Sequence, residues 1–249
     1  MDGTIQNLVK KKTLSSAWLL FSPLTKAAKQ IYVLGMNLQF YKDWGSYPSP
    51  EWFNHELDFV LFPQRRIVHF FERGVYGSEV VAGKRVLDLC SGDGSVAALF
   101  ISPLAKSVLG IDFDASAVHY AQKKWAKFSN CSFQVQDIRN PQIPAGQFDV
   151  CLWDAAIEHF TQTEMDQIFA SIKKALTQDG VLHGSTNQKQ DTKGHHEHEY
   201  EFSNLEELKK FVLKYFKYAQ VWQRNHADRN NLYFRASDKP LAETRVLSN

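Results

Sequence analysis

A glycine-containing turn behind an apolar run is the first place where this sequence could bind a ligand. Residues 86–94 read VLDLCSGDG, so that an acid, Asp88, stands inside the apolar run and two glycines follow it. Glycines permit a tight turn and let a ligand lie against the backbone. A second acid, Asp112, follows Gly92 by 20 residues and ends the next apolar run. The pattern predicts a nucleotide-type cofactor at the ends of two strands.

Two classes of cofactor fit this turn. The glycines, followed by Ala97, fit the permissive form of the dinucleotide fingerprint, and Asp112 stands where a ribose-binding acid belongs, which would suit NAD. The position of Asp88 favours S-adenosylmethionine instead, because an acid ahead of the turn repels a pyrophosphate and attracts a sulfonium and an ammonium. Asp112 would then accept from the ribose hydroxyls, and Asp137, after a third apolar run, from the adenine amino group.

Four segments, in this order, resemble the motifs of class I S-adenosylmethionine-dependent methyltransferases. They are residues 88–94, 110–112, 136–138 and 148–150, and the resemblance covers roughly residues 80–236. Cys90 and Ser91 stand where that family more commonly has glycine and a small residue. The resemblance implies an enzyme that uses S-adenosyl-L-methionine and releases S-adenosyl-L-homocysteine.

The resemblance also implies a fold and a set of cofactor contacts. The fold is α/β: a Rossmann-like, seven-stranded, mostly parallel sheet with an antiparallel C-terminal hairpin, plus an N-terminal helical segment. The expected cofactor-binding residues are Asp88, Leu89, Cys90, Gly92, Gly94, Asp112, Phe113, Asp137, Ile138 and Trp153, together with Tyr41 and Trp44 from the N-terminal segment.

The segment after the fourth expected strand faces the methyl group in the resembled family. His159 is a candidate general base there, because histidine titrates near neutrality. Asp154 could take the same role or orient the substrate. The alternative for His159 is an exposed or structural histidine at a helix start. The segment lacks the Pro-Pro-aromatic motif of enzymes that methylate exocyclic base amines, which argues against a DNA amino-methyltransferase.

A histidine-rich stretch, HHEHEY at residues 195–200, follows the fifth expected strand. In an extended segment His196 and His198 would share one face. Both are therefore candidate catalytic residues, through proton transfer or hydrogen bonds to substrate. A metal site and a solvated polar loop remain alternatives, and the spacing assigns no metal.

Alternating apolar runs and amphipathic stretches predict the elements that hold these residues. Strands are expected at 85–90, 107–112, 131–136, 148–153, 180–185, 218–223 and 231–236. Helices are expected from about 95, at 115–128, at 162–176 and at 203–216, the last with Ser203 as cap and Glu206 as its capping-box partner. The last two strands have no helix between them and must pair antiparallel.

The first 79 residues are expected to form an N-terminal helical or lid segment. Eleven aromatic residues lie within residues 40–76, and a helix start is expected at 49–51 with a second helical stretch at 64–73. Aromatic rings such as Tyr41 and Trp44 could exclude water and sit against a sulfonium, or simply pack. The methyltransferase domain is then expected at 80–240 and a loose tail at 241–249.

Composition limits the partners. The chain of 249 residues has a net charge of +2, which supplies no field for nucleic acid, and no segment is apolar enough to span a membrane. Three cysteines favour a reducing compartment and so the cytoplasm. We expect methylation of an oxygen or nitrogen of a small molecule, for example a sugar-like metabolite. The alternatives are a catalytically inactive methyltransferase-like binding partner and an NAD-binding oxidoreductase.

Overall fold

The computed structural model describes residues 3–44, 66–143, 145–189, 198–226 and 229–242. The chain divides into two compact units, Met1–Pro63 and Gln64–Asn249, and each is described by itself. The helix start expected at 49–51 lies outside the described residues. The division at 63/64 comes earlier in the chain than the boundary at 79/80 expected from the sequence.

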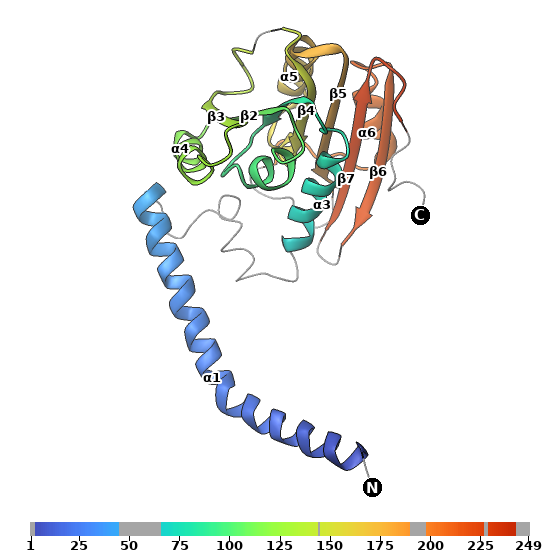
Figure 1. Ribbon diagram of the computed structural model, residues 1–249. Helices are drawn as coiled ribbons and strands as arrows, with labels where there is room; N and C mark the ends of the chain where they lie inside the picture. The colour runs from blue at the N-terminus through green and yellow to red at the C-terminus, as the bar shows by residue number, and fades with distance from the viewer. Residues whose placement is uncertain (1–2, 45–65, 144, 190–197, 227–228, 243–249) are drawn as a thin grey trace. The chain divides into compact units, whose positions relative to one another are not determined.

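In its described part, the first unit is one long helix, α1 (Gly3–Trp44). Pro23 lies inside this helix, and a proline removes a backbone N–H and bends a helix. Figure 1 shows the helix axis bending partway along. Several large apolar side chains of α1 are exposed, among them Trp18, Leu19 and Phe21. Within the described ranges, no helix is both long and apolar enough to cross a bilayer.

The second unit is built on a seven-stranded sheet with the strand order β3-β2-β1-β4-β5-β7-β6. Strands β1 to β5 run parallel, and β7 pairs antiparallel with both β5 and β6. The strands are β1 (Arg85–Leu89), β2 (Ser107–Asp112), β3 (Cys131–Val135), β4 (Phe148–Asp154), β5 (Leu176–Asn187), β6 (Tyr218–Asn225) and β7 (Asn230–Ser237). The predicted mostly parallel sheet with its C-terminal hairpin is confirmed.

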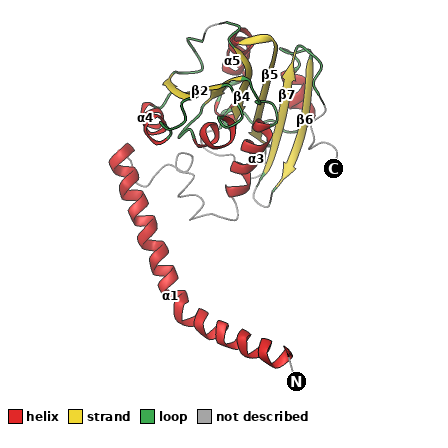
Figure 2. Cartoon of the chain, in the orientation of Figure 1, coloured by secondary structure: helices red, strands yellow, loops and turns green. Residues whose placement is uncertain are grey.

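Helices cover both faces of this sheet, as Figure 2 shows. They are α3 (Arg66–Ser78), the π-helical turn η1 (Ala97–Ile101), α4 (Ala115–Lys124), the 3₁₀ turn η2 (Ile157–His159), α5 (Gln162–Ala175) and α6 (Leu205–Val212). The prediction that Ser203 caps the last helix is wrong by one residue. Asn204 Oδ1 accepts from the Glu207 N–H at 2.9 Å, while the Ser203 N–H donates to the Glu207 carboxylate.

Strand register decides which side chains face which helical layer. Trp153 and Phe234 lie on the face that packs against Phe169 of α5. The next residues along these strands, Asp154 and Tyr233, point to the opposite face of the sheet. The strand register places Ser185 of β5 between them, paired with Asp154 on one side and with Tyr233 on the other. Because Tyr233 donates to Glu72 of α3, this second face is the one that α3 covers.

Helix α3 therefore belongs to the packing of the sheet unit. Phe70 is buried, and its ring meets Phe100 of η1 at 5.3 Å between centroids. Tyr76 meets Tyr233 of β7 at 4.8 Å. Phe71 is 47% exposed, although its ring also contacts Phe100. The lid role expected for residues 1–79 stays a prediction.

Candidate active site

The turn after β1 is held in backbone conformations that favour glycine. Cys90, Gly92 and Gly94 have φ values of 55°, 53° and 71°. A Cβ on Gly94 would lie 2.5 Å from the Phe133 ring, so this position also lacks room for a side chain. Cys90 accepts the conformation despite its Cβ, at a cost that residues at ligand sites commonly bear. The turn is thus shaped tightly by both backbone and packing.

Asp112, at the end of β2, fixes this turn from the neighbouring strand. Its carboxylate accepts from the N–H of Gly92 at 2.9 Å and from the N–H of Asp114 at 3.0 Å. Burial raises the pKa of Asp112, and those backbone donors oppose the shift. A carboxylate accepts about four hydrogen bonds, so lone pairs remain for two further donors, such as a ribose diol.

Two more acids meet on the α3 face of the sheet. Asp88 and Asp154 are buried, and burial, strengthened by the charge of Asp154, raises the pKa of Asp88 to about 8. Burial also raises the pKa of Asp154 to about 6, opposed by the nearby Ser185 hydroxyl. Within the described part of the chain, the Ser91 hydroxyl has no hydrogen-bond partner.

These acids and the turn suit a cationic ligand. Two neighbouring buried carboxylates are stabilised when a positive group binds between them. A pyrophosphate would add negative charge to the same place. The residues present therefore fit S-adenosylmethionine, which carries a sulfonium and an ammonium, better than a dinucleotide. Arg73 of α3 is the cationic side chain whose charge already lowers the pKa of both Asp88 and Asp154.

Three of the predicted cofactor-binding residues, Phe113, Asp137 and Ile138, lie in three different environments. Phe113 is 70% exposed directly after β2, and Ile138 is buried. The Asp137 carboxylate is held by Arg139, with an Nη2–Oδ2 distance of 2.7 Å, and this pairing lowers its pKa. Asp137 is therefore ionised and able to accept, but it already has a cationic partner.

Of four further predicted cofactor-binding residues, two have core side chains and two belong to the first unit. Leu89 and Trp153 are buried in the main hydrophobic core, where Trp153 packs against Phe160 and Phe169, so we assign both side chains to the core. Tyr41 is half-exposed on α1 of the first unit. The side chain of Trp44 lies outside the described part of the chain. The roles of Tyr41 and Trp44 stay predictions.

Two of the predicted catalytic histidines come together after β4. The rings of His159 and His198 meet edge to face, with 5.2 Å between centroids, although the residues are far apart in sequence. His198 Nδ1 donates to Glu201 Oε1 at 2.5 Å. Ligand atoms of Glu158, His159 and His198 lie within 4.8 Å of one another. His196 lies outside the described residues, and Asp154 lies with Asp88.

The sequence did not predict the residues that α3 and β7 contribute to the α3-covered face of the sheet. The charge of Arg73 lowers the pKa of the two buried acids, and Glu72 accepts from Tyr233 at 3.1 Å. No motif marks these positions. The available signal was the run of charged and polar residues within an otherwise apolar helix, His69, Glu72 and Arg73.

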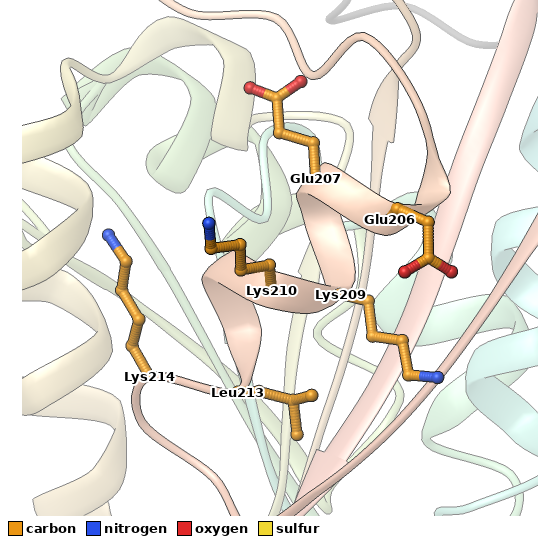
Figure 3. Close-up of a pocket in the computed structure, with 6 residues that line it drawn as sticks. All are labelled: Glu206, Glu207, Lys209, Lys210, Leu213 and Lys214. Atoms are coloured by element: carbon orange, nitrogen blue, oxygen red, sulfur yellow. The ribbon is translucent and has the colours of Figure 1, made fainter.

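Figure 3 shows a surface hollow elsewhere in the sheet unit, on α6. It has a volume of about 680 Å³ and is lined by Glu206, Glu207, Lys209, Lys210, Leu213 and Lys214. Four of its six side chains are mixed charges in the first and last turns of a short helix. It shares no residue with the predicted site, so we assign it no function.

Comparisons with known proteins agree with the motif pattern. Residues 86–180 match a family model described as a methyltransferase domain. No curated protein matches the sequence. Many solved structures share the fold. Three of them follow.

A methyltransferase from Aquifex aeolicus, described as dependent on S-adenosylmethionine, has a TM-score of 0.53 and 16% identity, over 66% of this chain and 88% of its own. A complex of DhpI with S-adenosylhomocysteine has a TM-score of 0.57 and 19% identity, over 74% and 92%. The [4+2]-cyclase SpnF has a TM-score of 0.56 and 13% identity, over 67% and 80%. At these identities the likeness shows the fold alone.

Proposed function

We propose that this chain is a class I S-adenosylmethionine-dependent methyltransferase and that it methylates an oxygen or nitrogen of a small molecule. The match of residues 86–180 to a methyltransferase-domain model supports this proposal. S-adenosylmethionine supplies an electrophilic methyl group on a cationic sulfur. The observation that carries the cofactor assignment is the pair of buried acids, Asp88 and Asp154, beside the left-handed turn at Cys90 and Gly92. A sugar-like metabolite is our candidate acceptor, since the near-neutral charge favours no polyanion.

In this proposal each acid has a distinct task. Asp88 lies at the strand end where it would bind the ammonium of the cofactor. Asp112 would accept from the ribose hydroxyls with the lone pairs that the backbone leaves open. Asp137 would accept from the adenine amino group beside Phe113. Of the three, Asp88 is the acid that would pair with a cationic group of the cofactor, and it does so in a buried site, where Coulomb attraction is stronger than in water.

Proton removal from the acceptor is the second task. We assign it to His198, because the Glu201 carboxylate holds its Nδ1–H and so leaves the lone pair on Nε2. Glu201 is a positioning residue, which the sequence analysis did not single out. His159 lies against the same ring and serves as the alternative base. The chemistry asks mainly for orientation of the nucleophile, with general-base help worth about 10²–10⁴ in rate.

Binding measurements test the cofactor assignment. Calorimetry should show binding of S-adenosylmethionine and S-adenosylhomocysteine and no binding of NAD. Asp88→Asn should weaken S-adenosylmethionine binding at least tenfold, because asparagine cannot ionise to pair with the cofactor ammonium. The exposed Asp179→Asn serves as the matched control and should bind as the wild type does. Tight NAD binding without affinity for S-adenosylmethionine would instead support an oxidoreductase.

Transfer of labelled methyl groups to a panel of metabolites tests the activity itself. His198→Ala should lower turnover at least 100-fold while cofactor binding stays intact, and Glu201→Gln should lower it less. The fold is also used by a [4+2]-cyclase, so cofactor binding alone does not establish transfer. Binding without transfer to any acceptor would favour the inactive binding partner. Transfer to protein or nucleic acid would refute the small-molecule acceptor.

We propose the cytoplasm as the location of the protein, because its cysteines are few and free.

A further inference from the structure

A cluster of metal-type ligands joins α3 to the β6–β7 hairpin, apart from the residues assigned to methyl transfer. It consists of His69 and Glu72 on α3 and His226 directly after β6. One ligand atom from each lies within 4.8 Å of the others. Figure 1 shows α3 alongside β7. The three residues thus meet through the fold, although His226 is more than 150 residues away in sequence.

The spacing of the donor atoms suits a shared ion. His69 and Glu72 are three residues apart on one helix, so their side chains leave the same face. His226 Nε2 lies 2.9 Å from Glu72 Oε2, and the rings of His69 and His226 stand 4.3 Å apart between centroids, nearly perpendicular. Two ligand atoms each bound at about 2.0–2.1 Å to one ion lie roughly 3 Å apart. The ligand atoms of His226 and Glu72 therefore already stand at metal-ligand spacing, and that of His69 lies within 4.8 Å of both.

Outer partners already orient two of the three ligands, His69 and Glu72. The amide of Asn231 contacts His69 Nδ1 at 3.1 Å, and Asn231 is itself buried. An amide can present oxygen or nitrogen after half a turn. With its oxygen toward Nδ1–H, the lone pair of His69 lies on Nε2. Glu72 accepts from Tyr233 at 3.1 Å and from Arg224 at 3.2 Å. Such carbonyl and hydroxyl partners are typical of metal-bound histidines and carboxylates.

We propose that His69, Glu72 and His226 bind a divalent first-row transition metal, with Zn²⁺ as the probe. Two imidazole nitrogens and one carboxylate suit such an ion better than Mg²⁺ or Ca²⁺, which prefer oxygen ligands. On binding, the proton between His226 Nε2 and Glu72 Oε2 goes to solvent, and both atoms bond the metal. The metal would tie α3 to the hairpin. It would thereby hold the helix that carries Arg73 beside Asp88 and Asp154.

The test is a Zn²⁺ titration of the full chain after chelator treatment, without S-adenosylmethionine. Calorimetry and metal analysis should give a bound Zn²⁺, which also raises the melting temperature, while Mg²⁺ should not bind. His226→Gln and Glu72→Gln should each weaken Zn²⁺ binding at least tenfold and abolish that rise. His119→Ala, at an exposed histidine on α4, is the matched control and should behave as the wild type.

Two further arms keep the outcome clear. The melting temperature of His226→Gln in chelator shows whether it folds, since glutamine can still donate to Glu72. A folded His226→Gln with wild-type Zn²⁺ affinity would overturn the proposal. So would loss of Zn²⁺ only in His198→Ala, which would place the metal at Glu158, His159 and His198 instead. No Zn²⁺ binding to the wild type would equally overturn it. None of these results depends on methyl transfer.

Discussion

Asp88 is the side chain at which the demands of folding and of ligand binding differ most. Its carboxyl is buried beside Asp154, and its pKa is raised to about 8, so the cofactor-free protein holds it largely protonated at neutral pH. An acid with a folded-state pKa above its unfolded value binds the proton more tightly when folded. Stability therefore falls as pH rises from about 4 to about 8, and the loss is complete above that window.

Asp88→Asn should relieve this loss in the cofactor-free protein. Asparagine cannot ionise, so its advantage in free energy of unfolding should be small near pH 4 and grow to the order of a few kcal/mol at pH 8. Denaturant unfolding of both proteins at pH 5 and pH 8 checks this. Equal differences at the two pH values would mean that Asp88 is already ionised in the folded chain.

The turn between β1 and η1 is the element that places this acid against a ligand. It combines left-handed backbone with crowding at Gly94, whose missing Cβ is replaced by the Phe133 ring. A second glycine, Gly83, has a similar φ of 68° but open space around its Cβ position. Substituting Gly83 therefore tests only the cost of a side chain on left-handed backbone, whereas substituting Gly94 adds the cost of the clash with Phe133.

Gly83→Ala should destabilise the protein by about 1–2 kcal/mol, through the left-handed backbone alone. Gly94→Ala should cost roughly 2–5 kcal/mol, because overpacking against Phe133 is added. Urea unfolding of the two variants measures both values. Equal losses would show that the Phe133 ring moves aside without cost.

Elements with a clear local signal were predictable, and their ends were less so. The strand over 107–112 was expected at its observed bounds, because an apolar run bounded by polar residues is sufficient to define it. The cap of α6 was placed at Ser203 instead of Asn204. Both residue types are good caps, and acids stand three residues after each, so spacing alone does not choose between them.

At the scale of the whole molecule, the contact-based division at 63/64 groups α3 with the sheet, whereas the sequence-based prediction groups it with the N-terminal segment. The contacts of α3 with β5 and β7 join segments that are about a hundred residues or more apart, and no local pattern records such contacts. For the same reason, the sequence did not predict the His69–Glu72–His226 cluster or the position of Arg73. The cofactor acids were predictable because one motif contains their order and spacing.

A chain shortened to residues 64–249 should therefore fold on its own and melt cooperatively near the full-length temperature. A chain that begins at Val80 should melt at a clearly lower temperature. It lacks the Tyr76 carbonyl and the Glu79 carboxylate, which accept from the buried Arg235 guanidinium at 2.8 Å and 2.7 Å. A buried charge without partners costs about 3–5 kcal/mol, or roughly 10 °C in melting temperature. Calorimetry measures the melting temperatures of both fragments. Equal temperatures would favour a domain boundary at 79/80.

The strand order also sets when this site can form during folding. Asp88 and Asp154 approach each other only once β1 pairs with β4, which closes a loop of about sixty residues. The β6–β7 hairpin, by contrast, pairs residues that are close in sequence. Pairing across long loops is slow. We therefore expect the hairpin to gain protection from hydrogen exchange early in refolding, and the two acids to become neighbours near the end.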